Sequence, residues 1–142
     1  MKSFFLIAVF VGLIFTISGC AKVGVKFNES ELINNSPQSA IVYFYRPYAF
    51  IGRIYSWPII ANGVEIASID NDAYVKKILK PDTYKLHSKS SAIDRISTFD
   101  FEAGKTYFVK CLLDEGVWVN SIRFVSLDKN DALLEIEKTS LQ

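Results

Sequence analysis

Two side chains in this sequence of 142 residues have the chemistry of a nucleophile and its base, the thiol of Cys111 and the imidazole of His87. His87 is the only histidine, so cysteine-based catalysis would need these two groups to meet in space. Cys111 lies in an apolar segment typical of a buried strand, and no sequence feature brings His87 to it. We therefore expect an inert core cysteine and a surface or half-buried structural histidine.

The other polar residues do not form a complete catalytic or metal-binding pattern. Asp70-Asn71-Asp72 resembles a fragment of a calcium loop, but it lacks the later glycine and glutamate, and a turn explains it more simply. One histidine and two cysteines exclude most zinc, haem and iron–sulfur schemes. There is no Ser/His/Asp order, paired catalytic carboxylates or glycine-rich phosphate loop. The sequence predicts a protein that is not an enzyme and has no cofactor and no metal.

Cys20 ends a leader that differs from the rest of the chain. Lys2 is followed by an apolar run from Phe4 to Ile17, and a basic start before a short apolar core is typical of a secretory signal. Ile17-Ser18-Gly19-Cys20 resembles the bacterial lipoprotein box. The resemblance implies that residues 1–19 are a signal peptide and that Cys20 is lipidated by acyl chains such as palmitate. The alternative is an uncleaved anchor with an incidental thiol.

The residue after the cysteine bears on the destination. Ala21 stands where an aspartate would signal inner-membrane retention, so by analogy with Gram-negative sorting we expect the outer membrane, facing the periplasm. The expected partners are the membrane, through the acyl chains on Cys20, and a protein of the cell envelope. Sixteen basic and fifteen acidic residues give a net charge of +1, which does not favour nucleic acid as a partner.

The segment from Arg46 to Trp57 is the richest in recognition residues, with two arginines and four aromatics in twelve positions. These types are favoured at binding hot spots. The candidate binding residues are Arg46, Tyr48, Phe50, Arg53 and Trp57. They would contact a partner protein, a lipid headgroup or a glycan. The alternative is that the aromatics fold back as a plug over the end of the domain, and we favour the plug because a small domain has little core to spare.

The rest of the chain has the patterns of β-strands. The expected strands, which are apolar runs or alternate apolar and polar residues, are 40–46, 55–61, 64–69, 73–79, 83–87, 96–103, 105–113 and 118–125. From Leu127 the apolar period lengthens, which predicts a C-terminal helix that includes Leu141 and has Asp128 as its N-cap. We expect a mainly β domain over residues 40–142, an antiparallel β-sandwich or small barrel of seven or eight strands, preceded by a tether over residues 20–39.

Several side chains are predicted to form the core of this domain. Residues 40–46 are apolar almost throughout and read as a central strand covered on both faces. The residues expected to be largely buried are Tyr43, Phe44, Phe99, Phe101, Tyr107 and Val109.

Four spaced motifs are similar to a family of small bacterial lipoproteins with a domain of unknown function. They are Val42-Tyr43-Phe44-Tyr45-Arg46-Pro47, Asn62-Gly63, Lys80-Pro81-Asp82-Thr83-Tyr84 and Ala103-Gly104-Lys105-Thr106-Tyr107-Phe108. In the family they form a Y-x-Y-R-P strand, an N-G hairpin, a turn with glycine where this chain has Asp82, and an A-G-K-T-Y strand. The resemblance spans about residues 40–137, implies a β-sandwich-like domain and brings no established activity.

The function expected from these patterns is that of a non-enzymatic, lipid-anchored envelope protein, a binding or structural module in the periplasm. The alternative is a carrier of a small ligand or lipid, with the aromatic interior lining a cavity. A tightly filled core would favour the first, and a cavity of several hundred cubic ångströms the second.

Overall fold

The computed structural model describes residues 25–32, 36–88, 95–115 and 120–142. Its strands are β1 (Ala40–Arg46), β2 (Trp57–Ala61), β3 (Val64–Ile69), β4 (Ala73–Leu79), β5 (Asp82–His87), β6 (Ser97–Phe101), β7 (Thr106–Glu115), β8 (Asn120–Leu127) and β9 (Ser140–Leu141). A short 3₁₀ helix, η1 (Glu29–Leu32), precedes them, and one α-helix, α1 (Lys129–Ile136), lies between β8 and β9. The leader and Cys20 lie outside the described residues.

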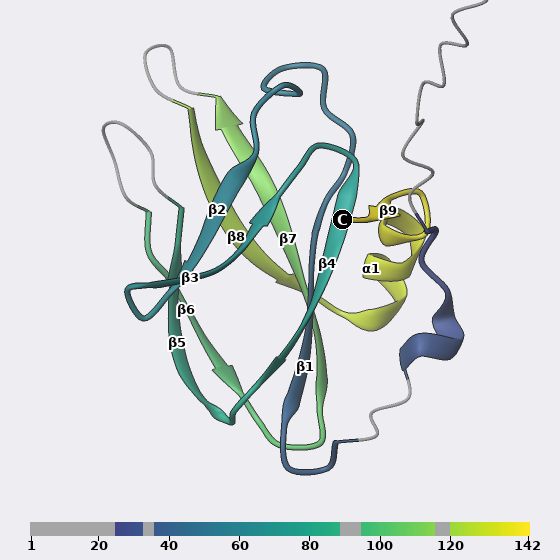
Figure 1. Ribbon diagram of the computed structural model, residues 1–142, viewed down its shortest axis with the longest axis vertical. Helices are drawn as coiled ribbons and strands as arrows, with labels where there is room; N and C mark the ends of the chain where they lie inside the picture. The colour runs from purple at the N-terminus through teal and green to yellow at the C-terminus, as the bar shows by residue number, and fades with distance from the viewer. Residues whose placement is uncertain (1–24, 33–35, 89–94, 116–119) are drawn as a thin grey trace, which may run out of the picture.

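Two sheets pack face to face, with α1 on the outer face of the larger one (Figure 1). The larger sheet has the order β8-β7-β1-β4-β9, and the smaller has the order β3-β2-β5-β6. The two sheets remain separate, so the predicted β-sandwich with one C-terminal helix is confirmed and the closed barrel is not.

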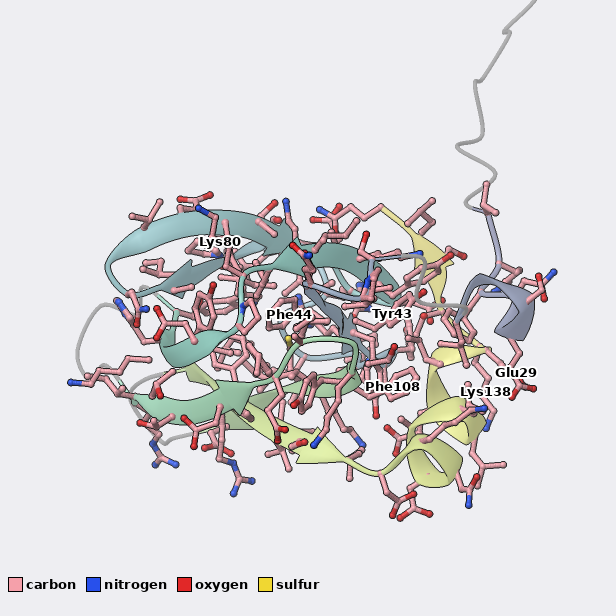
Figure 2. The ribbon with its side chains drawn as sticks, turned by 90° about the horizontal axis from the view of Figure 1, so that it is seen from below. Glu29, Tyr43, Phe44, Lys80, Phe108 and Lys138 are labelled. Carbon is pink, nitrogen blue, oxygen red and sulfur yellow. The ribbon has the colours of Figure 1, made fainter. Side chains whose placement is uncertain are left out.

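β1 is the central strand of the larger sheet, and all seven of its residues are buried. Side chains alternate between the two faces of a strand. Phe44 therefore points into the space between the sheets, whereas Tyr43 points to the face that α1 covers, beside Phe108 (Figure 2). The prediction of a strand covered on both faces is confirmed.

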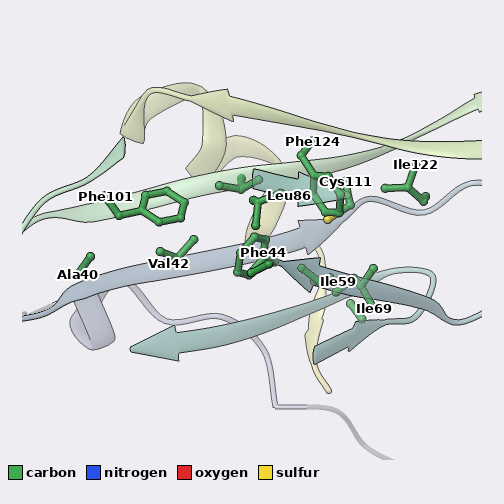
Figure 3. Close-up of a cluster of buried hydrophobic side chains, with 13 residues drawn as sticks. Ala40, Val42, Phe44, Ile59, Ile69, Leu86, Phe101, Cys111, Ile122 and Phe124 are labelled. Atoms are coloured by element: carbon green, nitrogen blue, oxygen red, sulfur yellow. The ribbon is translucent and has the colours of Figure 1, made fainter. Parts of the chain in front are cut away.

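Thirteen buried side chains fill the space between the sheets (Figure 3). The ring centroids of Phe44 and Phe124 are 6.4 Å apart, and those of Phe101 and Tyr107 are 4.9 Å apart. Of the six residues predicted to be buried, four are confirmed: Tyr43, Phe44, Phe101 and Val109. Phe99 and Tyr107 are half-buried and pack against the edge of this core.

The outer face of the larger sheet has its own apolar cluster. Phe27 is buried there, with its ring edge-on to Tyr43 at 5.4 Å and to Tyr74 at 5.5 Å. Lys26 also forms a single β-bridge with Ser140 of β9. Part of the segment expected to be a tether is therefore packed against the domain, because Phe27 finds an aromatic site that a flexible lead-in would leave empty.

The C-terminal helix begins as predicted and ends earlier. The Asp128 carboxylate accepts hydrogen bonds from the backbone N–H groups of Asn130 and Asp131, at 3.0 and 3.1 Å, which confirms the N-cap. α1 stops at Ile136, where the backbone N–H of Thr139 donates to the Ile136 carbonyl. The expectation that Leu141 belongs to the helix was wrong, because Leu141 lies in β9 and extends the larger sheet.

Two strand pairings depart from the antiparallel prediction. β1 pairs with β7 in parallel, and so does β4 with β9, whereas the other five pairings among the described strands are antiparallel. β2 begins at Trp57 rather than at Tyr55. Within the described ranges, no helix has the length and apolar character needed to cross a membrane.

Candidate functional site

Arg46, the last residue of β1, holds the segment that connects β1 to β2. We call this segment, residues 47–56, the β1–β2 loop. The Arg46 side chain is 1% exposed. Its Nη1 donates to the Tyr55 carbonyl at 2.8 Å, and its Nη2 donates to the Gly52 carbonyl at 2.9 Å. The Tyr55 N–H also donates to the Gly52 carbonyl, at 3.1 Å. One guanidinium therefore ties two points of the loop to the end of β1.

Gly52 is required where the loop turns. Its φ is +72°, a region that side chains rarely adopt. A Cβ on Gly52 would lie 2.9 Å from Cδ2 of Leu113. The turn therefore needs a residue without a side chain.

The turn between β3 and β4 supports the loop from the side. The Ala49 N–H donates to Oδ1 of Asn71 at 2.9 Å, and the neighbouring Asp72 has a φ of +56°. Asp70-Asn71-Asp72 is thus a turn, as expected. Within the part of the chain that the structure describes, no three or more His, Cys, Asp and Glu side chains are grouped so as to hold a metal ion.

The apolar side chains of the loop point into solvent. We define the loop surface as Tyr48, Phe50, Ile51, Arg53, Ile54 and Tyr55, all exposed. Phe50 is 71% exposed and Ile54 79%. The Arg53 guanidinium lies 4.8 Å from the centroid of the Phe50 ring.

The preferred interpretation of the loop as an end plug was therefore wrong. By alternation along β1, Arg46 shares the inward face of Val42 and Phe44, so its buried side chain ends the core between the sheets. With Arg46 in that place, the aromatics of the loop are not needed to close the end.

Arg46 and Trp57 differ from the other candidate binding residues. Burial lowers the pKa of the Arg46 guanidinium, and the nearby Cys111 and Asp70 oppose that shift. Because arginine ionises so far above neutrality, Arg46 stays charged, and its buried side chain, bonded to two carbonyls of the loop, positions the loop. Trp57 is half-buried, and its ring meets that of Tyr55 edge-on at 6.2 Å.

Two hollows flank the loop, and Tyr48 lines both of them. One, of about 190 Å³, lies between Arg46 and residues 110–113. The other, of about 260 Å³, includes Glu135 and Lys138. Glu135 already accepts hydrogen bonds from the Tyr45 hydroxyl at 3.1 Å and from Lys110 Nζ at 2.7 Å. Burial, followed by the charge of Glu135, raises the pKa of Tyr45, so its hydroxyl remains protonated.

The structure does not bring Cys111 and His87 together. Cys111 is 1% exposed and lies in the core between the sheets, where Leu86 of β5 also lies. Since His87 follows Leu86 on the same strand, alternation directs it to the opposite face. Burial raises the pKa of the Cys111 thiol, and Arg46 only partly opposes this. The expected buried cysteine and half-buried histidine are what the structure shows.

We expect the Cys111 thiol to be unreactive in the native protein. In a Cys20→Ser chain Cys111 is the only thiol, and it should resist a thiol reagent at pH 8 until urea unfolds the protein. Because its pKa is raised in the folded state, the thiol ionises more readily when unfolded, so stability should fall as the pH rises above about 8.5. Labelling of the native protein at the rate of a free thiol would contradict this.

Fold and site together define a class of protein, a small β-sandwich domain that presents an exposed apolar loop tied to a buried arginine. The chain belongs to the family described as proteins of unknown function, DUF2846, which matches residues 36–132, from the residues before β1 into α1. This confirms the expected domain of unknown function. No curated protein and no solved structure matches the chain.

Proposed function

We propose that the protein is a non-enzymatic lipoprotein of the bacterial cell envelope, with a β-sandwich held at the membrane by acylated Cys20 and the β1–β2 loop as its binding surface. The observation that carries the proposal is the loop itself, in which exposed apolar side chains stand on a backbone tied down by a buried arginine. The leader and the Ile17-Ser18-Gly19-Cys20 motif support the anchor, and Ala21 favours the outer membrane facing the periplasm.

The composition of the loop surface favours binding over chance exposure. Single exposed hydrophobic residues are normal on a protein, but a contiguous exposed apolar patch marks an interaction site. Five large hydrophobic side chains between residues 48 and 55 are at least 48% exposed. Because Arg46 and Asn71 already hold the backbone, a ligand would meet a preformed surface and bear little ordering cost.

The filled interior favours a binding module over a ligand carrier. Thirteen side chains occupy the space where the aromatic cavity of a carrier would be expected (Figure 3). The separation of Cys111 from His87 and the paired state of Glu135 support a role without catalysis.

Replacing Cys20 by serine tests the anchor. We expect the Cys20→Ser chain to take up no palmitate label and to be found as a precursor or in the soluble fraction, because the thiol is the sole attachment point. The matched control is Cys111→Ala, which removes the only other cysteine and should keep the label. A serine variant that still labels and stays in the membrane would contradict the proposal.

Replacing Tyr48, Phe50 and Arg53 together by serine tests the loop. We expect the free energy of unfolding to fall by only about 1 kcal/mol or less, since the chief loss is one exposed cation–π contact. Crosslinking of the protein to its binding partner in intact cells should be lost.

The matched control for this triple variant is Val64→Ser with Ile78→Ser. Both side chains are exposed hydrophobics outside the loop, with exposed fractions of 64% and 60%. This control should keep both stability and crosslinking. A marked fall in the melting temperature of the triple variant would show that the loop stabilises the fold.

A further inference from the structure

We propose that the β1–β2 loop inserts into the same lipid surface that holds the acyl chains of Cys20, so that the domain docks on its membrane. The proposal rests on the lipid anchor proposed above and names the ligand of the loop surface as a phospholipid bilayer. Its first support is the position of Lys26, where the chain from the anchor joins the sheet, close to the start of the loop. Its second support is the chemistry of the side chains of the loop surface.

Lys26, near the start of the described chain, lies in the same row of paired residues across the larger sheet as Arg46, the residue from which the β1–β2 loop begins. Across the larger sheet, Arg46 pairs with Ala73, Ala73 with Ser140, and Ser140 with Lys26. Neighbouring strands lie about 4.8 Å apart, so Lys26 is about 14 Å from Arg46. Figure 1 shows the described chain beginning beside β9, in the upper half of the view, where the loop is also found.

The number of residues between Cys20 and Lys26 limits the distance between this row of residues and the lipid. Val25 follows Cys20 by five residues, which span at most about 18 Å when fully extended. The opposite end of the sandwich, with Lys80 in the turn after β4, is farther from the anchor by the length of a seven-residue strand, about 23 Å. The anchor therefore holds the loop end nearer to the bilayer than the Lys80 end.

The side chains of the loop surface suit the boundary between water and hydrocarbon. Phe50, Ile51 and Ile54 are apolar, and the rings of Tyr48 and Tyr55 have the amphipathic character that is enriched at membrane interfaces. Arginine buries its stem in apolar surroundings and keeps its charge at the polar level. With its guanidinium over the Phe50 ring, Arg53 is placed to bind a lipid phosphate while Phe50 enters the acyl region.

Several backbone polar groups of the loop already have hydrogen-bond partners within the protein. An unpaired peptide group in hydrocarbon is costly, so inserted backbone must have its hydrogen bonds satisfied within the protein. Arg46 satisfies the carbonyls of Gly52 and Tyr55, and Asn71 satisfies the N–H of Ala49. These bonds lower the cost of moving this part of the loop toward hydrocarbon.

The mature chain carries equal numbers of basic and acidic side chains once Lys2 is removed, so long-range attraction to an anionic surface is not what drives docking. Insertion of the apolar side chains is the driving force. Docking should therefore persist at high salt, where electrostatic attraction is screened.

The test uses the mature acylated chain in vesicles of phosphatidylethanolamine and phosphatidylglycerol. A nitroxide is attached at Ile51→Cys and, as the matched control, at Lys80→Cys, two exposed positions at opposite ends of the sandwich. The label at position 51 should be accessible to oxygen, which dissolves in lipid, and protected from a water-soluble nickel complex. The label at position 80 should show the reverse.

Phe50→Ser with Ile54→Ser, added to the position-51 label, should remove its protection. Withdrawing two large apolar side chains from hydrocarbon lowers the docking equilibrium constant by at least about a hundredfold. Both side chains are exposed in the free domain, so the fold should be unaffected.

Two outcomes would overturn membrane docking, and a third would contradict the lipid anchor. An acylated chain whose two labels are equally open to the nickel complex would overturn membrane docking and leave the anchor intact. A label at position 51 that is protected in native membranes but not in pure lipid would also overturn it, because the loop would then bind a protein. A chain without acyl groups on Cys20 would contradict the proposed function itself.

Discussion

Replacing Arg46 by methionine is expected to lower the free energy of unfolding by about 3–6 kcal/mol, because hydrogen bonds to a charged group contribute about 1.5–3 kcal/mol each and two are lost. Methionine retains an unbranched apolar stem, so the loss reports on the hydrogen bonds to the Tyr55 and Gly52 carbonyls. The β1–β2 loop should also lose its fixed conformation, which amide hydrogen exchange would detect at Tyr55.

Urea unfolding of Arg46→Met and Arg53→Met, side by side, gives the clearest measurement. Arg53 lies on the same loop, but it is exposed and its guanidinium lies over the Phe50 ring, so its loss should cost about 1 kcal/mol or less. Arg46→Lys should fall between the two, since an ammonium group keeps the charge without the planar fork. Equal stabilities of the two methionine variants would show that the buried guanidinium does not hold the loop.

Truncating Phe101 to alanine is expected to cost about 3–5 kcal/mol, the usual loss when a large aromatic side chain is removed from a packed core. Phe101 is 2% exposed, and its ring contacts Tyr84, Phe99 and Tyr107 at centroid distances of 5.5, 5.8 and 4.9 Å. The cavity left behind lies between the two sheets, where the backbone on both sides prevents it from collapsing.

Phe99→Ala is the matched control, because Phe99 lies on the same face of β6 and is only half-buried. Its truncation should cost less than half as much as that of Phe101. A loss under about 1 kcal/mol for Phe101→Ala would mean that the strand faces are inverted, since a shift by one residue moves every side chain to the other face.

Local patterns predicted the strands well. β1, β3 and β4 have the boundaries expected from their apolar runs, and the Asn62-Gly63 signal lies at the turn between β2 and β3, with φ values of +49° and +82°. The cap at Asp128 was equally local. These features depend on neighbouring residues, which a sequence displays directly.

Features that join distant segments were not accessible in this way. The parallel pairing of β1 with β7 brings Ile41 beside Thr106, and no local pattern encodes it. The end of α1 was missed because Leu141 fits an apolar helical period as well as it fits an edge strand. Phe27 was assigned to the tether because its aromatic partners come from β1 and β4.

The candidate site shows the same division. The composition of residues 46–57 singled out a loop that the structure shows to be exposed, and alternation from Phe44 would have placed Arg46 inward. The end-plug interpretation missed the exposure of Phe50, and Ile54 was not among the candidate residues of the loop surface. Both side chains are exposed because the buried Arg46 side chain occupies the end of the core. Asn71, which holds the loop, lies 22 residues from its hydrogen-bond partner, and nothing in its local sequence marks that contact.

The position of β1 in the larger sheet has a consequence for how the chain folds. Its neighbours are β4 and β7, and β9, which borders β4, lies at residues 140–141. During synthesis, which starts at the N-terminus, the chain can form the β2–β3 hairpin early. β1 acquires its second neighbour, β7, only when residues beyond 105 are present. Sheets dominated by such distant pairings fold slowly, because loop closure precedes the contacts that stabilise it. The chain should therefore remain without its central sheet for most of its synthesis, a state in which it can still be threaded or bound as an extended polypeptide.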